Sequence, residues 1–256
     1  MKTSLMLCAL LCVASICRAQ ATTHPPVGIE EHLGATLPLD VELYTEDGFR
    51  VPLSSILNRP TILMFVYFKC PGICTPLLTE VSHLVEKMSL VPGKEYQIIT
   101  VSFDPDEKPD LAKDKKETYL EGMKKKIDPA GWRFMTGDSA SIARLTDAAG
   151  FYYRRENGLW IHSGALIAVS PKGKITRYLT GIQHLPFDLT MAMYEAQEGR
   201  TGPTIAKVMA FCFPYDPVGK HYAFDIVRVS GVVIVLLAGG IALVLFRRPK
   251  SKTPKA

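Results

Sequence analysis

The sequence lacks the short motifs that mark several large enzyme classes. It contains no glycine-rich phosphate-binding loop, no dinucleotide-binding fingerprint and no helix with the paired histidines of a metalloprotease. Neither Cys70 nor Cys74 has the Thr or Ser three residues earlier that peroxiredoxins usually require. These absences disfavour nucleotide-dependent, proteolytic and peroxidase chemistry.

The chain also lacks an excess of basic residues once its two ends are set aside. Of the 30 basic residues, two lie in residues 1–21 and five in residues 247–256, which leaves 23 against 25 acidic residues. Binding to nucleic acid needs a basic footprint. We therefore expect no nucleic-acid partner.

Both ends carry membrane-targeting patterns. Lys2 precedes an apolar run at 5–16, and the small residues around Ala21 suit cleavage, so residues 1–21 are predicted to be a signal peptide. Residues 229–246 form an 18-residue stretch without a charge, long enough to cross a bilayer as one helix. The charged residues that follow this stretch are all basic, which predicts a cytoplasmic tail over 247–256. The preceding domain is therefore expected outside a bacterial cell membrane, on the periplasmic or extracytoplasmic side.

Cysteine is scarce in the mature chain. Three of the six cysteines leave with the predicted signal peptide, and Cys70, Cys74 and Cys212 remain. An odd count outside the cytoplasm indicates one local pair and one leftover thiol. We interpret Cys212, in the juxtamembrane segment 201–228, as a buried or membrane-edge thiol whose role stays open.

The cysteine pair lies at a predicted strand-to-helix turn. The apolar run Thr61–Tyr67 is typical of a strand buried on both faces, and helical periodicity follows from Leu77 to Met88. A helix start favours thiolates, which ligate metals or attack disulfides. Three intervening residues allow Cys70 and Cys74 to share a soft metal ion or to close a disulfide, structural or redox-active.

Three further residues are candidates for the same site. His162 precedes an apolar strand, where packing is the ordinary role, but an imidazole would complete a copper shell begun by two thiolates. Asp104 and Asp106 follow the predicted strand 97–103 and could flank the site or cap the next helix.

The remaining pattern predicts an α/β fold with a mixed sheet. Hairpins are expected over 39–53 and 165–179. A short strand is expected at 132–135, and helices are expected over 109–126, 139–149 and 185–197.

These residues together resemble the Sco/SenC family, over about residues 33–197. The resemblance is carried by Phe68-Lys-Cys-Pro-Gly-Ile-Cys-Thr-Pro76, by Val101-Ser-Phe-Asp-Pro105 with Pro109, and by His162-Ser163 with the hairpin behind it. It implies a thioredoxin-like domain over 22–200 in which Cys70, Cys74 and His162 bind copper, and it links Asp104 or Asp106 to function. It also implies a partner, the copper-containing subunit of cytochrome c oxidase, at whose dinuclear centre the copper is used.

The sequence departs from the family pattern at three points. Gly72 stands where an acidic residue is frequent, Thr75-Pro76 inverts the usual order, and the predicted anchor is C-terminal. The leading hypothesis is a membrane-anchored copper chaperone, a binding protein and not a turnover enzyme. The alternatives are a thiol–disulfide oxidoreductase that uses Cys70 and Cys74 to keep oxidase cysteines reduced, or a redox sensor.

Overall fold

The computed structural model describes residues 27–201, 215–216 and 221–222, together with Ile234 and Leu237. The predicted signal peptide, the tail 247–256 and most of segments 201–228 and 229–246 lie outside the described residues. Among the residues that are described, no helix has the length and apolar character needed to cross a bilayer.

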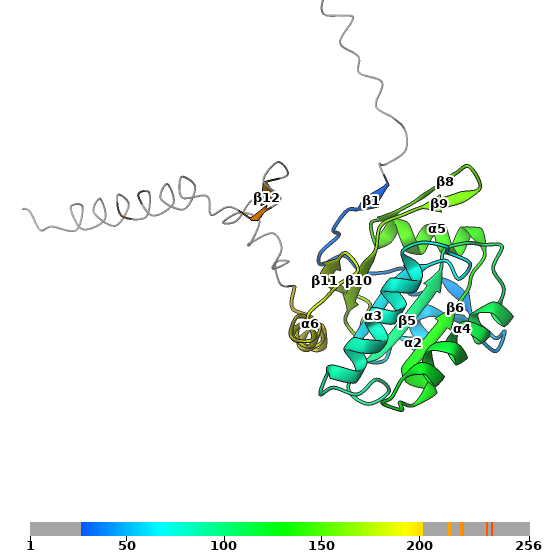
Figure 1. Cartoon of the computed structure of the whole chain (residues 1–256), viewed down its shortest axis with the longest axis horizontal. Helices are drawn as coiled ribbons and strands as arrows, with labels where there is room; N and C mark the ends of the chain where they lie inside the picture. The colour runs from blue at the N-terminus through cyan, green and yellow to red at the C-terminus, as the bar shows by residue number, and fades with distance from the viewer. Residues whose placement is uncertain (1–26, 202–214, 217–220, 223–233, 235–236, 238–256) are drawn as a thin grey trace, which may run out of the picture.

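A five-stranded mixed sheet forms the centre of the domain, with strand order β11-β10-β4-β5-β6 (Figure 1). Strands β4, β5 and β6 are parallel, whereas β10 runs antiparallel to both β4 and β11. Their bounds are β4 Thr61–Val66, β5 Gln97–Ser102, β6 Trp132–Met135, β10 Ala165–Val169 and β11 Ile175–Thr180.

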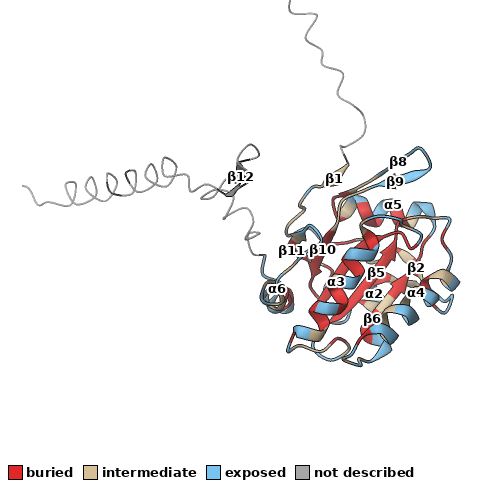
Figure 2. Ribbon diagram, viewed as in Figure 1, coloured by how far each residue is buried: buried red, intermediate tan, exposed pale blue. Residues whose placement is uncertain are grey.

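The two central strands are buried along their whole length. Every residue of β4 and β5 is buried, because elements cover both faces of the sheet (Figure 2). Unbroken apolar runs are expected of such strands. Both were predicted from the sequence, and they lie within one residue of the predicted bounds.

In the part of the chain that the structure describes, four helices longer than two turns and two short ones surround the sheet. Helix α4 ends at Gly122, four residues before the predicted end, and the chain then buries Met123 in the core. Helix α6 packs against β10 and β11, and α3 against α4. The helix bounds are α2 Leu53–Ile56, α3 Cys74–Lys87, α4 Pro109–Gly122, η1 Pro129–Gly131, α5 Ser139–Ala148 and α6 Pro186–Glu198.

Small two-stranded pairings complete the described chain. The predicted hairpin near residue 45 is present as β2 with β3, and β1 pairs with β7. A further hairpin, β8 with β9, was not predicted. The bounds are β1 Gly28–Ile29, β2 Glu42–Tyr44, β3 Arg50–Pro52, β7 Phe151–Tyr152, β8 Arg154–Glu156, β9 Leu159–Ile161, β12 Tyr215–Asp216 and β13 His221–Tyr222.

Candidate metal centre

The two cysteines lie where the central strand β4 passes into helix α3. Cys74 is the first residue of α3 and is buried, whereas Cys70 lies in the preceding loop and is half-buried. Both are free thiols. The backbone N–H of Gly72 donates to the Cys70 sulfur over 3.3 Å, so the short loop folds back on its own thiol.

His162 reaches the cysteines from the far side of the sequence. It lies between β9 and β10, and its Nε2 is 3.4 Å from the Sγ of Cys74. The donor atoms of Cys70, Cys74 and His162 all lie within 4.8 Å of one another. Because β10 pairs with β4, the histidine that precedes β10 comes to the sheet edge at which β4 ends.

The imidazole of His162 is held in its neutral form. Its Nδ1 lies 3.0 Å from the carbonyl oxygen of Ser163, which can only accept, so Nδ1 carries the proton. The lone pair of Nε2 is then directed toward Cys74. Burial lowers the pKa of His162, which keeps the ring uncharged and able to bind a metal at neutral pH.

The two thiols have opposite electrostatic settings. Burial opposes ionisation of Cys70, but hydrogen bonds from the backbones of Cys74 and Gly72 and from the Cys74 and Tyr67 side chains lower its pKa overall. Burial, above all, raises the pKa of Cys74, and the charges of Cys70 and Glu107 add to that rise. Cys70 is therefore the more reactive thiol, and a cation that binds both sulfurs must displace the proton of Cys74.

Aromatic rings enclose the histidine. The ring centroids of Phe103, Tyr67 and Phe151 lie 5.0, 5.7 and 6.2 Å from that of His162. Burial raises the pKa of Tyr67 to about 12, and its contact with Cys70 adds to the effect, so the phenol stays protonated. This apolar surround keeps bulk water from one side of the donor atoms.

The two candidate aspartates take different positions. Asp104 accepts a hydrogen bond of 2.9 Å from the indole Nε1 of Trp160, two residues before His162. Asp106 is exposed, and its carboxylate lies 3.9 Å from the guanidinium of Arg155. Neither belongs to the group of three donor residues. Asp104 contacts the histidine segment through Trp160, and the N–H of Asp106 donates to the Asp104 carboxylate over 3.0 Å.

Two features of the site were missing from the sequence-based prediction. The β8–β9 hairpin carries Trp160 and leads the chain into His162. Its turn, Asn157-Gly158, has positive φ at both residues, and this Asn-Gly pair is a strong hairpin signal that could have been used. The second feature is Glu107, a buried carboxylate whose partners lie next to Cys70.

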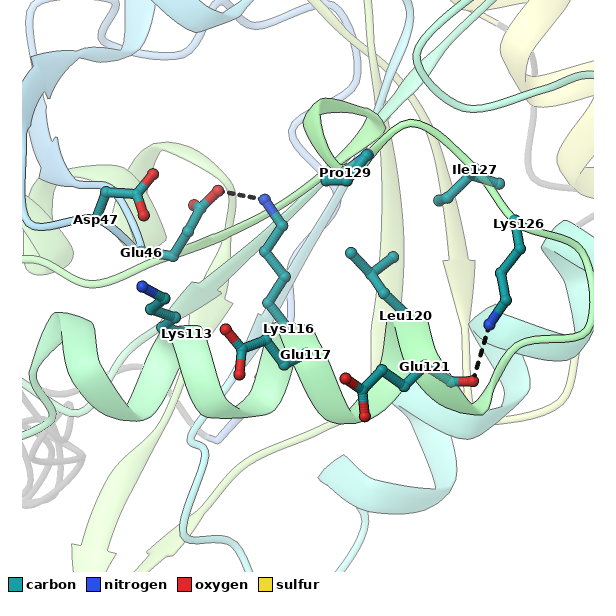
Figure 3. Close-up of a pocket in the computed structure, with 10 residues that line it drawn as sticks. All are labelled: Glu46, Asp47, Lys113, Lys116, Glu117, Leu120, Glu121, Lys126, Ile127 and Pro129. Carbon is teal, nitrogen blue, oxygen red and sulfur yellow. Dashed lines mark hydrogen bonds and ion pairs between the residues drawn. The ribbon is translucent and has the colours of Figure 1, made fainter.

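A separate hollow lies away from the cysteines, between α4 and the turn that follows β2 (Figure 3). It encloses about 530 Å³. The buried carboxylate of Glu46 pairs there with Lys116 and, over 2.9 Å, with Arg133. These contacts pair the charge of Glu46 within the domain.

The fold and the donor set define a thioredoxin-like domain with a Cys-Cys-His group that could hold a metal ion. Comparison with known proteins agrees with this class. The model of the SCO1/SenC family matches residues 33–191, and the chain belongs to that family.

Individual relatives are distant in sequence. A SCO1 protein homolog from Bacillus subtilis is 26% identical over 160 residues, which cover 59% of this chain and 79% of the relative. The copper-bound structure of ScoI from Arabidopsis thaliana is 21% identical with a TM-score of 0.51, and the match covers 65% of this chain and 99% of that one. BsSco, described as a Sco family member with a disulfide switch, is 20% identical with a TM-score of 0.52, covering 66% and 97%. At these identities the two structures support the fold.

Proposed function

We propose that this protein binds one copper ion through the sulfurs of Cys70 and Cys74 and the Nε2 of His162. The observation that carries the proposal is the approach of these three donor atoms to within 4.8 Å of one another. Two soft sulfurs and an imidazole suit copper, whereas hard cations prefer oxygen. The family's association with copper in relatives such as the Arabidopsis protein supports the same choice of metal.

The proposed role of the bound copper is in assembly of the dinuclear copper centre of a cytochrome c oxidase subunit. The Sco family is described as one of oxidase assembly proteins, which supports this partner. Cys70 is only half-buried, so a partner's ligands can approach the metal from that side. The protein then acts as a membrane-anchored copper chaperone, with residues 229–246 as the anchor and the domain outside the cytoplasm.

Copper analysis of the reduced full-length protein in detergent tests the proposal. We expect one copper per chain in the wild type and a large loss of affinity in His162→Ala. His83→Ala is the matched control, because His83 is exposed on α3 and should leave the affinity unchanged. Wild-type affinity in His162→Ala would contradict the three-ligand site.

A thiol–disulfide oxidoreductase is the second candidate, and one observation favours it. The half-buried Cys70, with its lowered pKa, and the buried Cys74 have the asymmetry of an attacking and a resolving thiol. Such activity does not need the imidazole. Reductase activity that survives His162→Ala, in a protein whose wild type binds no copper, would favour this function over the first.

The topology is tested separately. A reporter enzyme that works only outside the cytoplasm, fused after Ala256, should be inactive if the basic tail is cytoplasmic. Activity of that fusion would contradict the proposed anchor orientation.

A further inference from the structure

Glu107 is a buried carboxylate in a strongly charged turn. Its neighbours Asp106 and Lys108 are exposed, but Glu107 itself is only 3% exposed. A buried carboxylate is costly unless hydrogen bonds compensate for the water it has lost. The turn between β5 and α4 therefore directs this side chain inward to specific partners.

Two of those partners lie in the loop that leads to Cys70, and the third is the last residue of β5. One carboxylate oxygen accepts hydrogen bonds from the N–H of Phe68 over 2.7 Å and from the hydroxyl of Ser102 over 2.6 Å. The other accepts from the N–H of Lys69 over 2.8 Å. All three partners can donate, so a carboxylate, which only accepts, satisfies them together.

These bonds supply hydrogen-bond partners for backbone N–H groups between the end of β4 and Cys70. Pairing of β4 with the β5 side continues as far as Val66, whose carbonyl accepts from the N–H of Phe103 over 2.9 Å. Beyond it, the N–H of Cys70 donates to the carbonyl of Tyr67. Of the N–H groups between these contacts, those of Phe68 and Lys69 are held by Glu107. Without that carboxylate, the N–H groups of Phe68 and Lys69 would lose these hydrogen-bond partners.

We propose that Glu107 is a positioning residue that presets the Cys70 to Cys74 loop, so that both sulfurs face His162 before a metal arrives. The inference rests on the proposed function only in taking these three residues as the copper ligands. Partners of this kind fix the orientation of metal ligands, and losing one lowers metal affinity by about 10- to 100-fold.

The test compares Glu107→Gln with Glu117→Gln in the full chain. In Glu107→Gln the remaining oxygen can serve Phe68 and Ser102, but the new NH₂ group confronts the N–H of Lys69, so a donor faces a donor. Glu117 is exposed on α4, and its change to Gln alters charge equally. We expect copper affinity to fall by about 10- to 100-fold in Glu107→Gln only.

Two readouts need no copper. Hydrogen exchange of the Lys69 amide should accelerate by about tenfold or more in Glu107→Gln, while Ile99 in the buried β5 stays protected. The equilibrium of Cys70 and Cys74 with glutathione should also shift. In it the two thiols lose two protons and two electrons to one glutathione disulfide, which becomes two glutathione thiols.

Ser102→Ala controls for a general loss of stability. It removes one donor to Glu107 and the acceptor of the Asp104 N–H but keeps both backbone bonds to Glu107, so copper affinity should fall less than in Glu107→Gln at equal loss of unfolding free energy. Affinity that merely follows stability in both variants would overturn the positioning role, as would unchanged Lys69 exchange and glutathione equilibrium. If both shift as expected but the wild type binds no copper, the positioning role stands and the proposed copper function is refuted.

Discussion

The chain contains two tryptophans, and their contrasting environments allow a sharp test of how the histidine segment is held. The indole N–H of Trp160 donates to Asp104 over 2.9 Å, whereas that of Trp132 donates to the hydroxyl of Thr100 over 2.9 Å deep in the core. Trp→Phe removes one N–H donor in each case. Only Trp160 lies beside the candidate metal centre.

The expected magnitude follows from the bond that is lost. A hydrogen bond to a charged group contributes about 1.5–3 kcal/mol, and partial exposure of Trp160 and Asp104 places this bond at the lower end of that range. The aromatic contacts of Trp160 with Tyr153 and Phe103, at 5.4 and 6.0 Å, can largely persist in Phe. Loss of this hydrogen bond leaves the segment that carries His162 less firmly held. If binding copper must then supply the free energy of the lost bond, copper affinity should fall by about tenfold, since 1.4 kcal/mol is a factor of ten.

Trp132→Phe should show the opposite pattern. The side chain of Trp132 is fully buried in β6, so the cavity and the unpaired Thr100 hydroxyl should reduce the free energy of unfolding by about 2 kcal/mol. Its copper affinity should match the wild type. Urea unfolding and competitive copper titration measure the two quantities. Unchanged copper affinity in Trp160→Phe, or an equal loss of copper affinity in both variants, would refute the reasoning.

Three further predictions concern the thiols and one ion pair. Alkylation at neutral pH should reach Cys70 before Cys74, since only Cys70 has a lowered pKa; mass spectrometry of quenched samples measures the order, and a reversed order would contradict the assignment. Closing the Cys70–Cys74 disulfide should abolish copper binding, because neither sulfur then offers a thiolate; equal binding by oxidised and reduced protein would refute this. Glu46 is buried, which raises its pKa, but hydrogen bonds and charges from Lys116 and Arg133 lower it overall. Its contribution to stability is therefore present above the ordinary pKa of a glutamate and is lost as pH falls through the folded value. Glu46→Gln should cost about 3 kcal/mol at pH 7, with the gap to the wild type closing in acid; a constant gap across an acid titration of unfolding would contradict this.

The sheet was predictable because its two central strands are rich in apolar residues, as strands buried on both faces are. The apolar runs that became β4 and β5 need no knowledge of their neighbours to be recognised. The end of α4 was predicted less well, because the charged pattern continues past Gly122, whereas the helix ends there and Met123 turns into the core.

The donor residues were predictable from their types, but their support was not. Cys70 and Cys74 are close in sequence, and His162 was recognised from the chemistry that two thiolates require. Glu107 stands among exposed charged residues, and nothing local distinguishes it. Its burial depends on Phe68 and Lys69, which precede it by almost forty residues.

The separation of the three proposed ligands along the chain has a consequence for when copper can enter. Cys74 and His162 are 88 residues apart, and they meet only after β10 has paired with β4. An unfolded or partly synthesised chain offers two neighbouring sulfurs but no imidazole beside them. If these residues bind copper as proposed, correct metal loading is coupled to completion of the fold, and copper captured earlier would be held by an incomplete ligand set from which competing thiols could remove it.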